Sequence, residues 1–318
     1  MSVTVTGPGR DTLTVTRAAG VADDFRIFRI WSTTTVTING LTMANGRSTS
    51  NGGGIYTEGN VYLFNSAVKD CRASGTGGGI YVSGAGSVGL YNSIVSGNRA
   101  DGNGGGIFAS GSTDDPPGNR IEINDKSQIY NNTSINGAGG GIYIGKPFTG
   151  RSDRLYIGNS TINQNVSQLE GGGLYIAATQ GGQFQGTISE SEVDENRSVT
   201  SSAGAVFAGG ELTCTSSDFD GNSGAAGAGY AITILDGVPV TFDRCSIANN
   251  RFTGVGTDAA AVNCPGTDTS SVLFKGSTVS GNSLHGVSGI VRSNGGNYVE
   301  DSATTSVGWL PPPDDLVT

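Results

Sequence analysis

Short runs of alternating apolar and polar residues recur along the chain, and Gly, Asn, Ser or Asp residues bound each run. One frame repeats at intervals of about 30 residues: a Ser is followed five positions later by an Asn, as in Ser93 and Asn98. Strands place successive side chains on opposite faces, so this alternation predicts many short β-strands. We therefore expect a repeat fold that keeps a fixed frame in each turn and varies its loops.

Three apolar rows are attached to this frame. The first row follows a glycine triplet and contains Ile55, Ile80, Ile107, Ile142, Leu174 and Val206. The second precedes the Ser of the frame, in pairs such as Val61 and Leu63. The third lies between Ser and Asn and contains Val68, Val95, Ile129, Ile162, Val193, Phe219, Ile247 and Val279. One turn cannot bury such rows alone, so stacked turns must supply the core.

The pattern predicts an all-β chain that forms a single parallel β-helix, or β-solenoid, with three strands per coil and about ten coils. We expect residues 1–35 to form an N-terminal coil or cap, residues 36–295 the repeats, and residues 296–318 a C-terminal cap or tail. No run of 18 apolar residues is present, so we expect no membrane insertion. The first residues lack the basic and apolar regions of a signal peptide, and we expect the chain to be part of a larger gene product.

The asparagine row and the glycine triplets predict the corners of the coil. Asn tolerates the left-handed αL bend, and its amide can hydrogen-bond the Asn of the next coil. We therefore predict an asparagine ladder at the bend. The triplet, first met at Gly52, Gly53 and Gly54, suits a corner that needs a positive φ.

Charge and cysteine positions limit the chemistry. The net charge of −9 argues against nucleic acid and anionic membrane surfaces as partners. The four cysteines occupy different rows, so we predict four free thiols at Cys71, Cys214, Cys245 and Cys264, with Cys214–Cys245 the least improbable bridge. The single histidine, His285, has no catalytic partner at a recognisable spacing and is expected in a surface turn.

Two motifs alternate along the repeats. One is "GGxI", as in the segments that end Gly78-Gly79-Ile80 and Gly105-Gly106-Ile107, and the other is "[FIV]xxN", as in Val95-Ser-Gly-Asn98. This alternation resembles the repeats of polymorphic outer membrane proteins and the wider class of bacterial right-handed, pectate-lyase-like β-helix repeat proteins. The resemblance covers roughly residues 30 to 295 and implies a secreted or cell-surface domain, often adhesive. The glycine motif decays in the C-terminal half, which weakens the resemblance there.

An aromatic residue follows the first apolar position of each repeat and is expected to point outward. We call these residues the aromatic row: Tyr56, Tyr81, Phe108, Tyr143, Tyr175 and Phe207. Such rings can stack on sugars or anchor a protein partner. The alternative is that the rings stack on each other or lie under long loops.

An acidic cluster occupies the outward positions of the third strand in two successive coils: Glu192, Asp194, Asp218 and Asp220. Stacking should place Glu192 beside Asp218 and Asp194 beside Asp220, and like charges directly opposite each other are destabilising. Ca²⁺ binds carboxylate oxygens in flexible geometry, so we hypothesise a Ca²⁺ site. The alternative is a solvated acidic patch.

These observations favour a non-catalytic extracellular or cell-surface module that binds a polysaccharide or a surface protein along one face. One alternative is a Ca²⁺-dependent polysaccharide lyase or a glycoside hydrolase, which would use the acidic cluster with Arg197 or Arg244. A second alternative is the structural subunit of a fibre, because open solenoid ends expose strand edges and permit end-to-end self-association.

Overall fold

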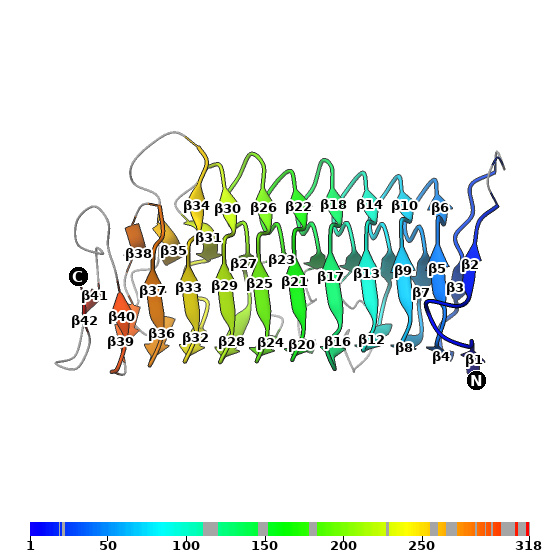
Figure 1. Cartoon of the computed structure of the whole chain (residues 1–318), viewed down its shortest axis with the longest axis horizontal. Helices are drawn as coiled ribbons and strands as arrows, with labels where there is room; N and C mark the ends of the chain where they lie inside the picture. Colours follow the sequence, from blue (N-terminus) through cyan, green and yellow to red (C-terminus); the bar gives the residue numbers. More distant parts are fainter. Residues whose placement is uncertain are drawn as a thin grey trace.

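The computed structural model describes residues 1–18, 20, 23–110, 120–145, 152–177, 183–226, 229–254, 260–264, 272–283, 285–289, 291–293, 295–299, 309–310 and 316–317. Every regular element in these ranges is a β-strand, and every pairing between strands is parallel. Figure 1 shows the strands of successive coils side by side along a rod, with β1 and β42 at opposite ends. The predicted all-β parallel solenoid is confirmed.

Two 12-stranded sheets run the length of the rod. Sheet A contains β1 Ser2–Thr6, β4 Thr35–Asn39, β8 Asn60–Phe64, β12 Ser87–Tyr91, β16 Arg120–Asn124, β20 Ser152–Gly158, β24 Gln183–Ser189, β28 Glu211–Thr215, β32 Val240–Asp243, β36 Val272–Lys275, β39 Val291–Ser293 and β41 Trp309–Leu310. Sheet B contains β2 Thr14–Thr16, β5 Thr42–Ala44, β9 Ala67–Lys69, β13 Ile94–Ser96, β17 Gln128–Tyr130, β21 Thr161–Asn163, β25 Glu192–Asp194, β29 Asp218–Asp220, β33 Ser246–Ala248, β37 Thr278–Ser280, β40 Tyr298–Val299 and β42 Leu316–Val317.

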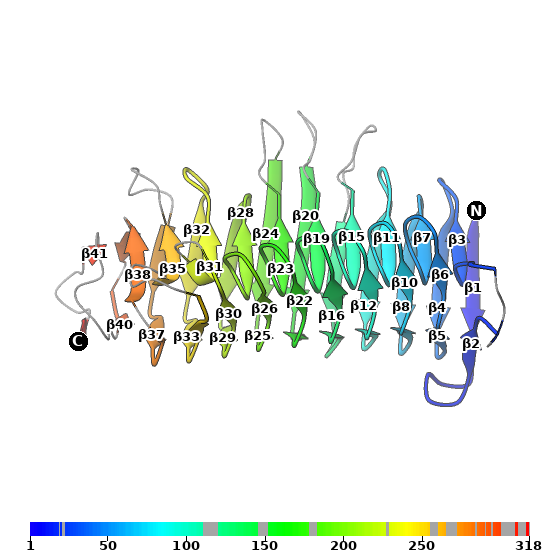
Figure 2. The same cartoon turned by 90° about the horizontal axis from the view of Figure 1, so that it is seen from above.

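Two further sheets complete the coil. Sheet D contains β6 Arg47–Ser48, β10 Arg72–Ala73, β14 Arg99–Ala100, β18 Thr133–Ser134, β22 Val166–Ser167, β26 Arg197–Ser198, β30 Ser223–Gly224 and β34 Arg251–Phe252. Sheet C contains β3 Phe28–Ile30, β7 Ile55–Thr57, β11 Ile80–Val82, β15 Ile107–Ala109, β19 Ile142–Ile144, β23 Leu174–Ile176, β27 Val206–Ala208, β31 Gly229–Ile234, β35 Ala260–Cys264 and β38 His285–Gly289. In the coils that contain a strand of sheet D, the chain passes through sheets A, B, D and C in turn (Figures 1 and 2).

The expectation of three strands per coil differs from this structure. Eight coils of the described chain carry a fourth strand, the two-residue strand of sheet D. It follows the ladder Asn directly, as Arg99–Ala100 follows Asn98, and it pairs with the same two positions of the neighbouring coils. Two residues are too short to show apolar alternation, so the sequence pattern did not reveal this strand.

Among the described residues, three kinds of corner with a positive backbone φ recur along the rod. The first corner precedes the Ser of the frame, at Asn65, Asn92, Lys126, Asn159, Glu190, Ser216, Arg244 and Gly276. The second precedes the Asn, at Asn45, Asp70, Gly97, Asn131, Gln164, Glu195, Gly221, Asn249 and Gly281. The third is the first residue of the glycine triplet, at Gly52, Gly77, Gly104, Gly139, Gly171 and Ala203. The predicted glycine corner is therefore confirmed at the first glycine.

The second corner corrects the prediction that the ladder Asn itself makes the αL bend. Gly97 has a φ of 65°, whereas Asn98 is not among the described residues with positive φ. The bend therefore lies one residue earlier, which frees the Asn98 side chain to point inward. The other two glycines of a triplet serve a close approach between coils: a Cβ on Gly105 would lie 2.5 Å from the Gly140 carbonyl oxygen.

The core fills the space between the four sheets. All three predicted apolar rows are buried, and Leu63, Val95 and Ile107 are each 0% exposed. The cysteines are confirmed as free thiols, and all four are buried. Burial is the main cause that raises the pKa of the Cys264 thiol to about 12, so it stays protonated and behaves as a small apolar side chain.

Two ladders of buried polar side chains run parallel to the rod axis. The asparagine ladder is confirmed over seven described coils, at Asn98, Asn132, Asn165, Asn196, Asn222, Asn250 and Asn282. The Nδ2 of each of the first six donates to the Oδ1 of the next Asn at 3.0–3.1 Å, and the Nδ2 of all seven donates to a backbone carbonyl of the preceding coil. A second ladder was not predicted: backbone N–H groups of the Ser row donate to the Oγ of the next Ser, as from Ser93 to Ser127 at 3.0 Å.

Removing one rung of the asparagine ladder should destabilise the whole rod. The Oδ1 of Asn165 accepts the N–H and the Nδ2 of Asn132, and its Nδ2 donates to the Ile129 carbonyl. In Asn165→Ala these buried groups lose partners, and we expect the free energy of unfolding to fall by about 3 kcal/mol in urea denaturation. Asn136→Ala, at an exposed position, is the control and should change it by less than about 0.5 kcal/mol. Equal stability of the two variants would contradict the role of the ladder.

Candidate functional site

The aromatic row lies on the outer face of sheet C. In β7, β11 and β15 the first and third residues are buried and the middle residue is half-buried, so the alternation places the rings outward as predicted. Strand register aligns the row directly, since Tyr81 pairs with Tyr56 on one side and with Phe108 on the other. The row continues through Tyr143 and Tyr175 to Phe207.

The six rings form one continuous stack. Neighbouring ring centroids are 4.7–5.2 Å apart, and the planes are inclined by 24° at the first pair and by 9° or less at the others. Each inner ring therefore has both faces covered by its neighbours, and its edge forms the accessible part. The rings do stack on each other, as the alternative interpretation of the row proposed; whether the row binds a ligand stays a prediction.

The N-terminal end of the stack is covered by cations. The Arg26 and Arg29 guanidinium groups lie 5.1 and 5.3 Å from the Tyr56 ring centroid, within cation–π range.

Burial is the first cause that raises the pKa of Tyr175 to about 12, and Tyr143 and Glu170 add to the shift. The Tyr175 phenol therefore stays neutral and can donate a hydrogen bond near neutral pH.

A second, shorter stack lies on sheet A and was missed in the sequence. The Phe64 and Tyr91 rings are stacked with centroids 4.7 Å apart at 9°. They share a register position at the ends of β8 and β12. A Cβ on Gly89 would lie 2.7 Å from a Tyr62 ring carbon, so glycine here leaves room for that ring. The available signal was an outward aromatic residue seven positions before the ladder residue, Phe64 before Cys71 and Tyr91 before Asn98, but only two coils carry it.

The acidic cluster has the predicted stacking. Glu192 pairs with Asp218 in register, and the Asp220 N–H donates to Asp194 Oδ1 at 3.0 Å. Burial is the first cause that raises the pKa of Asp194 to about 6, and repulsion by Glu192, Asp220 and Asp218 adds to it, while the hydrogen bond from Asp220 opposes the shift. Asp194 is therefore partly protonated in mildly acidic solution.

The described residues contain no group of three or more His, Cys, Asp or Glu side chains arranged to hold a metal ion. The Ca²⁺ hypothesis thus gains no support from geometry and stays a prediction. A rise of the melting temperature with Ca²⁺ that disappears in Asp194→Asn would establish it, and no response to Ca²⁺ would refute it.

The remaining candidates for chemistry are dispersed. Arg244 Nε lies 3.4 Å from Asp243 Oδ1, and Arg197 is an exposed residue at the start of β26. The prediction that His285 lies in a turn is wrong. His285 is the first residue of β38 and pairs with Ala260 of β35. The sequence analysis missed a row of arginines on β6, β10 and β14. The available signal was an Arg two residues after the second corner, at Arg47, Arg72 and Arg99.

Neutralising Asp194 should stabilise the protein above pH 6. The folded chain holds this proton more tightly than an unfolded carboxyl of pKa 3.8, so ionised Asp194 opposes folding and stability is gained as the pH falls from about 6 towards 3.8. Asp194→Asn keeps an acceptor for the Asp220 N–H, and we expect a higher melting temperature than wild type at pH 8, with a difference that narrows below pH 6. Asp236→Asn, in an exposed turn, is the matched control and should show no such pH-dependent gap. A gap that widens as the pH falls would contradict the assignment.

Comparison with known proteins matches one segment of the solenoid. Residues 92–110 match the family of the Chlamydia polymorphic membrane protein repeat. The matched segment spans all three corners of one coil, at Asn92, Gly97 and Gly104, and ends just after Phe108 of the aromatic row. The chain matches no curated protein and no solved structure. Among the described residues no helix is long and apolar enough to cross a membrane. The chain is a parallel β-solenoid, and its residues 92–110 are similar to the polymorphic membrane protein repeat.

Proposed function

We propose that this protein is a non-catalytic cell-surface module that binds a polysaccharide or a surface protein along the outer face of sheet C. The matched repeat is named for membrane proteins, which supports a surface-associated β-helical protein in general terms. The observation that carries the proposal is the aromatic row: six rings at one repeat position form an unbroken, half-exposed stack across six coils.

The stack suggests how such a ligand would be held. Because neighbouring rings cover each other's faces, a ligand would lie across the ring edges and not between the rings. The edges offer an apolar band interrupted by the phenol hydroxyls of Tyr56, Tyr81, Tyr143 and Tyr175, a combination of apolar body and polar tip that suits binding interfaces. The strands beneath pair with a neighbour on both sides, so we expect little backbone conformational entropy to be lost when a ligand binds.

Removing two rings should abolish binding. We expect Tyr81→Ala with Tyr143→Ala to lose the wild-type signal on a glycan array or on a panel of surface proteins, because each change opens a gap in the stack. Phe64→Ala, which breaks the other stack, is the matched control and should bind as wild type. Circular dichroism would verify that the variants fold. Binding that survives in the double variant would refute a role for the aromatic row.

A specific observation also favours end-to-end association of copies of this chain. β1, β2 and β3 each form the edge of their sheet, and each presents unpaired backbone groups. Val3 and Val15 align with the buried Val36 and Met43, and in the described part of the chain they are 36% and 38% exposed. An edge of this kind, with apolar residues in the core rows, is suited to stack on another coil.

Charges placed in these rows should prevent the association. We expect wild type to show a sedimentation coefficient that rises with concentration, and Val3→Lys with Val15→Lys to remain monomeric, because lysines in the core rows would be buried on stacking. Asn136→Lys adds a charge at an exposed position away from this end and serves as the control. A wild-type chain that stays monomeric at all concentrations would rule out the association.

A further inference from the structure

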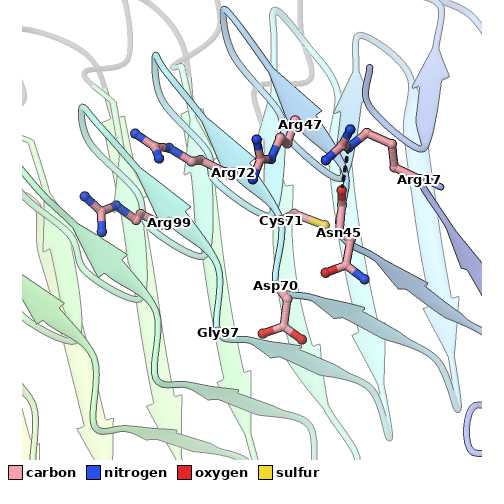
Figure 3. A pocket seen from close by; sticks show the side chains of 8 residues that line it. All are labelled: Arg17, Asn45, Arg47, Asp70, Cys71, Arg72, Gly97 and Arg99. Atoms are coloured by element: carbon pink, nitrogen blue, oxygen red, sulfur yellow. Dashed lines mark hydrogen bonds between the residues drawn. The ribbon is translucent and has the colours of Figure 1, made fainter. Parts of the chain in front are cut away.

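Arginines occupy the first position of three successive strands of sheet D. Arg47 pairs with Arg72, and Arg72 pairs with Arg99, so one arginine from each coil lies directly over the next. The backbones of adjacent strands are about 4.8 Å apart. Figure 3 shows the three side chains extending from successive coils on the same side of the solenoid, with Arg17 beside them, where its Nε donates to the Asn45 carbonyl at 3.3 Å. We call these four residues the arginine row.

The charges of Arg47, Arg72 and Arg99 have few anionic partners among the described residues. Within the described part of the chain, Arg47 and Arg99 make no ion pair and no side-chain hydrogen bond. Arg72 contacts Asp101 at 3.3 Å, with side chains 50% and 31% exposed, and a surface pair of this kind contributes little to stability and is readily exchanged for a ligand. Like charges directly opposite each other on neighbouring strands are destabilising, so an anion bound along the row would relieve repulsion.

The row lines two adjoining hollows in the surface. The larger, of about 260 Å³, is lined by the arginine row together with Asn45, Asp70 and other corner residues (Figure 3). The smaller, of about 120 Å³, is lined by Asp24, Arg47, Ser48, Arg72 and Ser74. Arg47 and Arg72 line both, so the two hollows share these arginines.

We propose that the arginine row binds a linear polysaccharide that carries carboxylate or sulfate groups. Guanidinium groups bind such oxyanions bidentately, and arginines repeated along the rod axis suit a polymer whose charges also repeat. The hydroxyls of the sugars would bond with the side chains of Asn45, Asp70 and Ser74, which line the hollows. The site lies on sheet D, whereas the aromatic row lies on sheet C, so it does not depend on the function proposed for that row.

Charge distribution disfavours nucleic acid at this surface. The chain carries a net charge of −9, and the carboxyl groups of Asp24 and Asp70 lie within the hollows, where a continuous phosphodiester backbone would meet them. The row is also short, because Thr133 and Val166 take the equivalent position in the next two coils. A hydroxyl-rich polymer with spaced charges tolerates both features.

The test compares immobilised heparin, which carries sulfates and carboxylates, with polygalacturonate, which carries carboxylates alone. We expect the full chain to bind at least one of them, with affinity that falls as salt rises. Arg99→Gln alone should weaken binding on the order of tenfold, and Arg47→Gln, Arg72→Gln and Arg99→Gln together should abolish it. Binding to heparin alone would identify sulfate as the recognised group, and binding to both polymers would identify the carboxylate.

The matched control removes three exposed arginines elsewhere, as Arg154→Gln, Arg197→Gln and Arg251→Gln, and should bind as wild type. Tyr81→Ala with Tyr143→Ala should also retain binding, which separates this proposal from the function of the aromatic row. The proposal is overturned if neither polymer binds, if the triple variant of the arginine row binds as tightly as its control, or if a single-stranded oligonucleotide is the one polymer that binds. Circular dichroism confirms folding; all six arginines are exposed, so their loss leaves the core unchanged.

Discussion

The parallel hydrogen bonding between coils is the constraint on which the rest of this structure depends. Each strand pairs in register with the equivalent strand of the coils before and after it, so each side chain lies over its counterpart about 4.8 Å away. A residue type at one position of the repeat must therefore be compatible with contact to equivalent residues in the neighbouring coils. Ile80 and Ile107 therefore bury each other in a core that a single coil could not form. Gly105 and its counterparts are glycines because a Cβ there would clash with the backbone of the next coil.

Rows differ in whether their members satisfy one another. An amide has both donors and an acceptor, so Asn132 and Asn165 bond in line and remain fully buried. Aromatic rings stack, as Tyr143 does on Tyr175. Like charges repel each other, so a row of carboxylates or guanidinium groups is not stabilised by its own members and favours an ion or ligand of opposite charge. In a solenoid such rows are therefore the natural places to seek an external ligand.

The balance of aromatic residues changes along the rod. The outer stack ends at Phe207, which pairs with Thr233 of the next coil. From there the large rings lie in the core: Phe219 contacts Phe242 edge-on with centroids 6.1 Å apart, and Phe242 stacks on Phe274 at 4.9 Å. The glycine triplet decays over the same coils, and Ala203 adopts a φ of 58° where glycine stood before. The coil of Ala203 therefore keeps the third corner although alanine has replaced the first glycine of the triplet.

The sequence by itself determined the solenoid, the inward rows, the outward aromatic row and the asparagine ladder, because a side-chain period of two and a fixed Ser–Asn frame leave few other ways to bury the apolar positions. It did not determine the strands of sheet D, since two residues carry no period, nor the residue at which the second corner bends. Only the tertiary structure decided that the aromatic faces are closed by stacking and that Arg47, Arg72 and Arg99 lie in line. Those contacts join residues about 30 positions apart in the chain, and loops of variable length set their register, which local sequence does not specify.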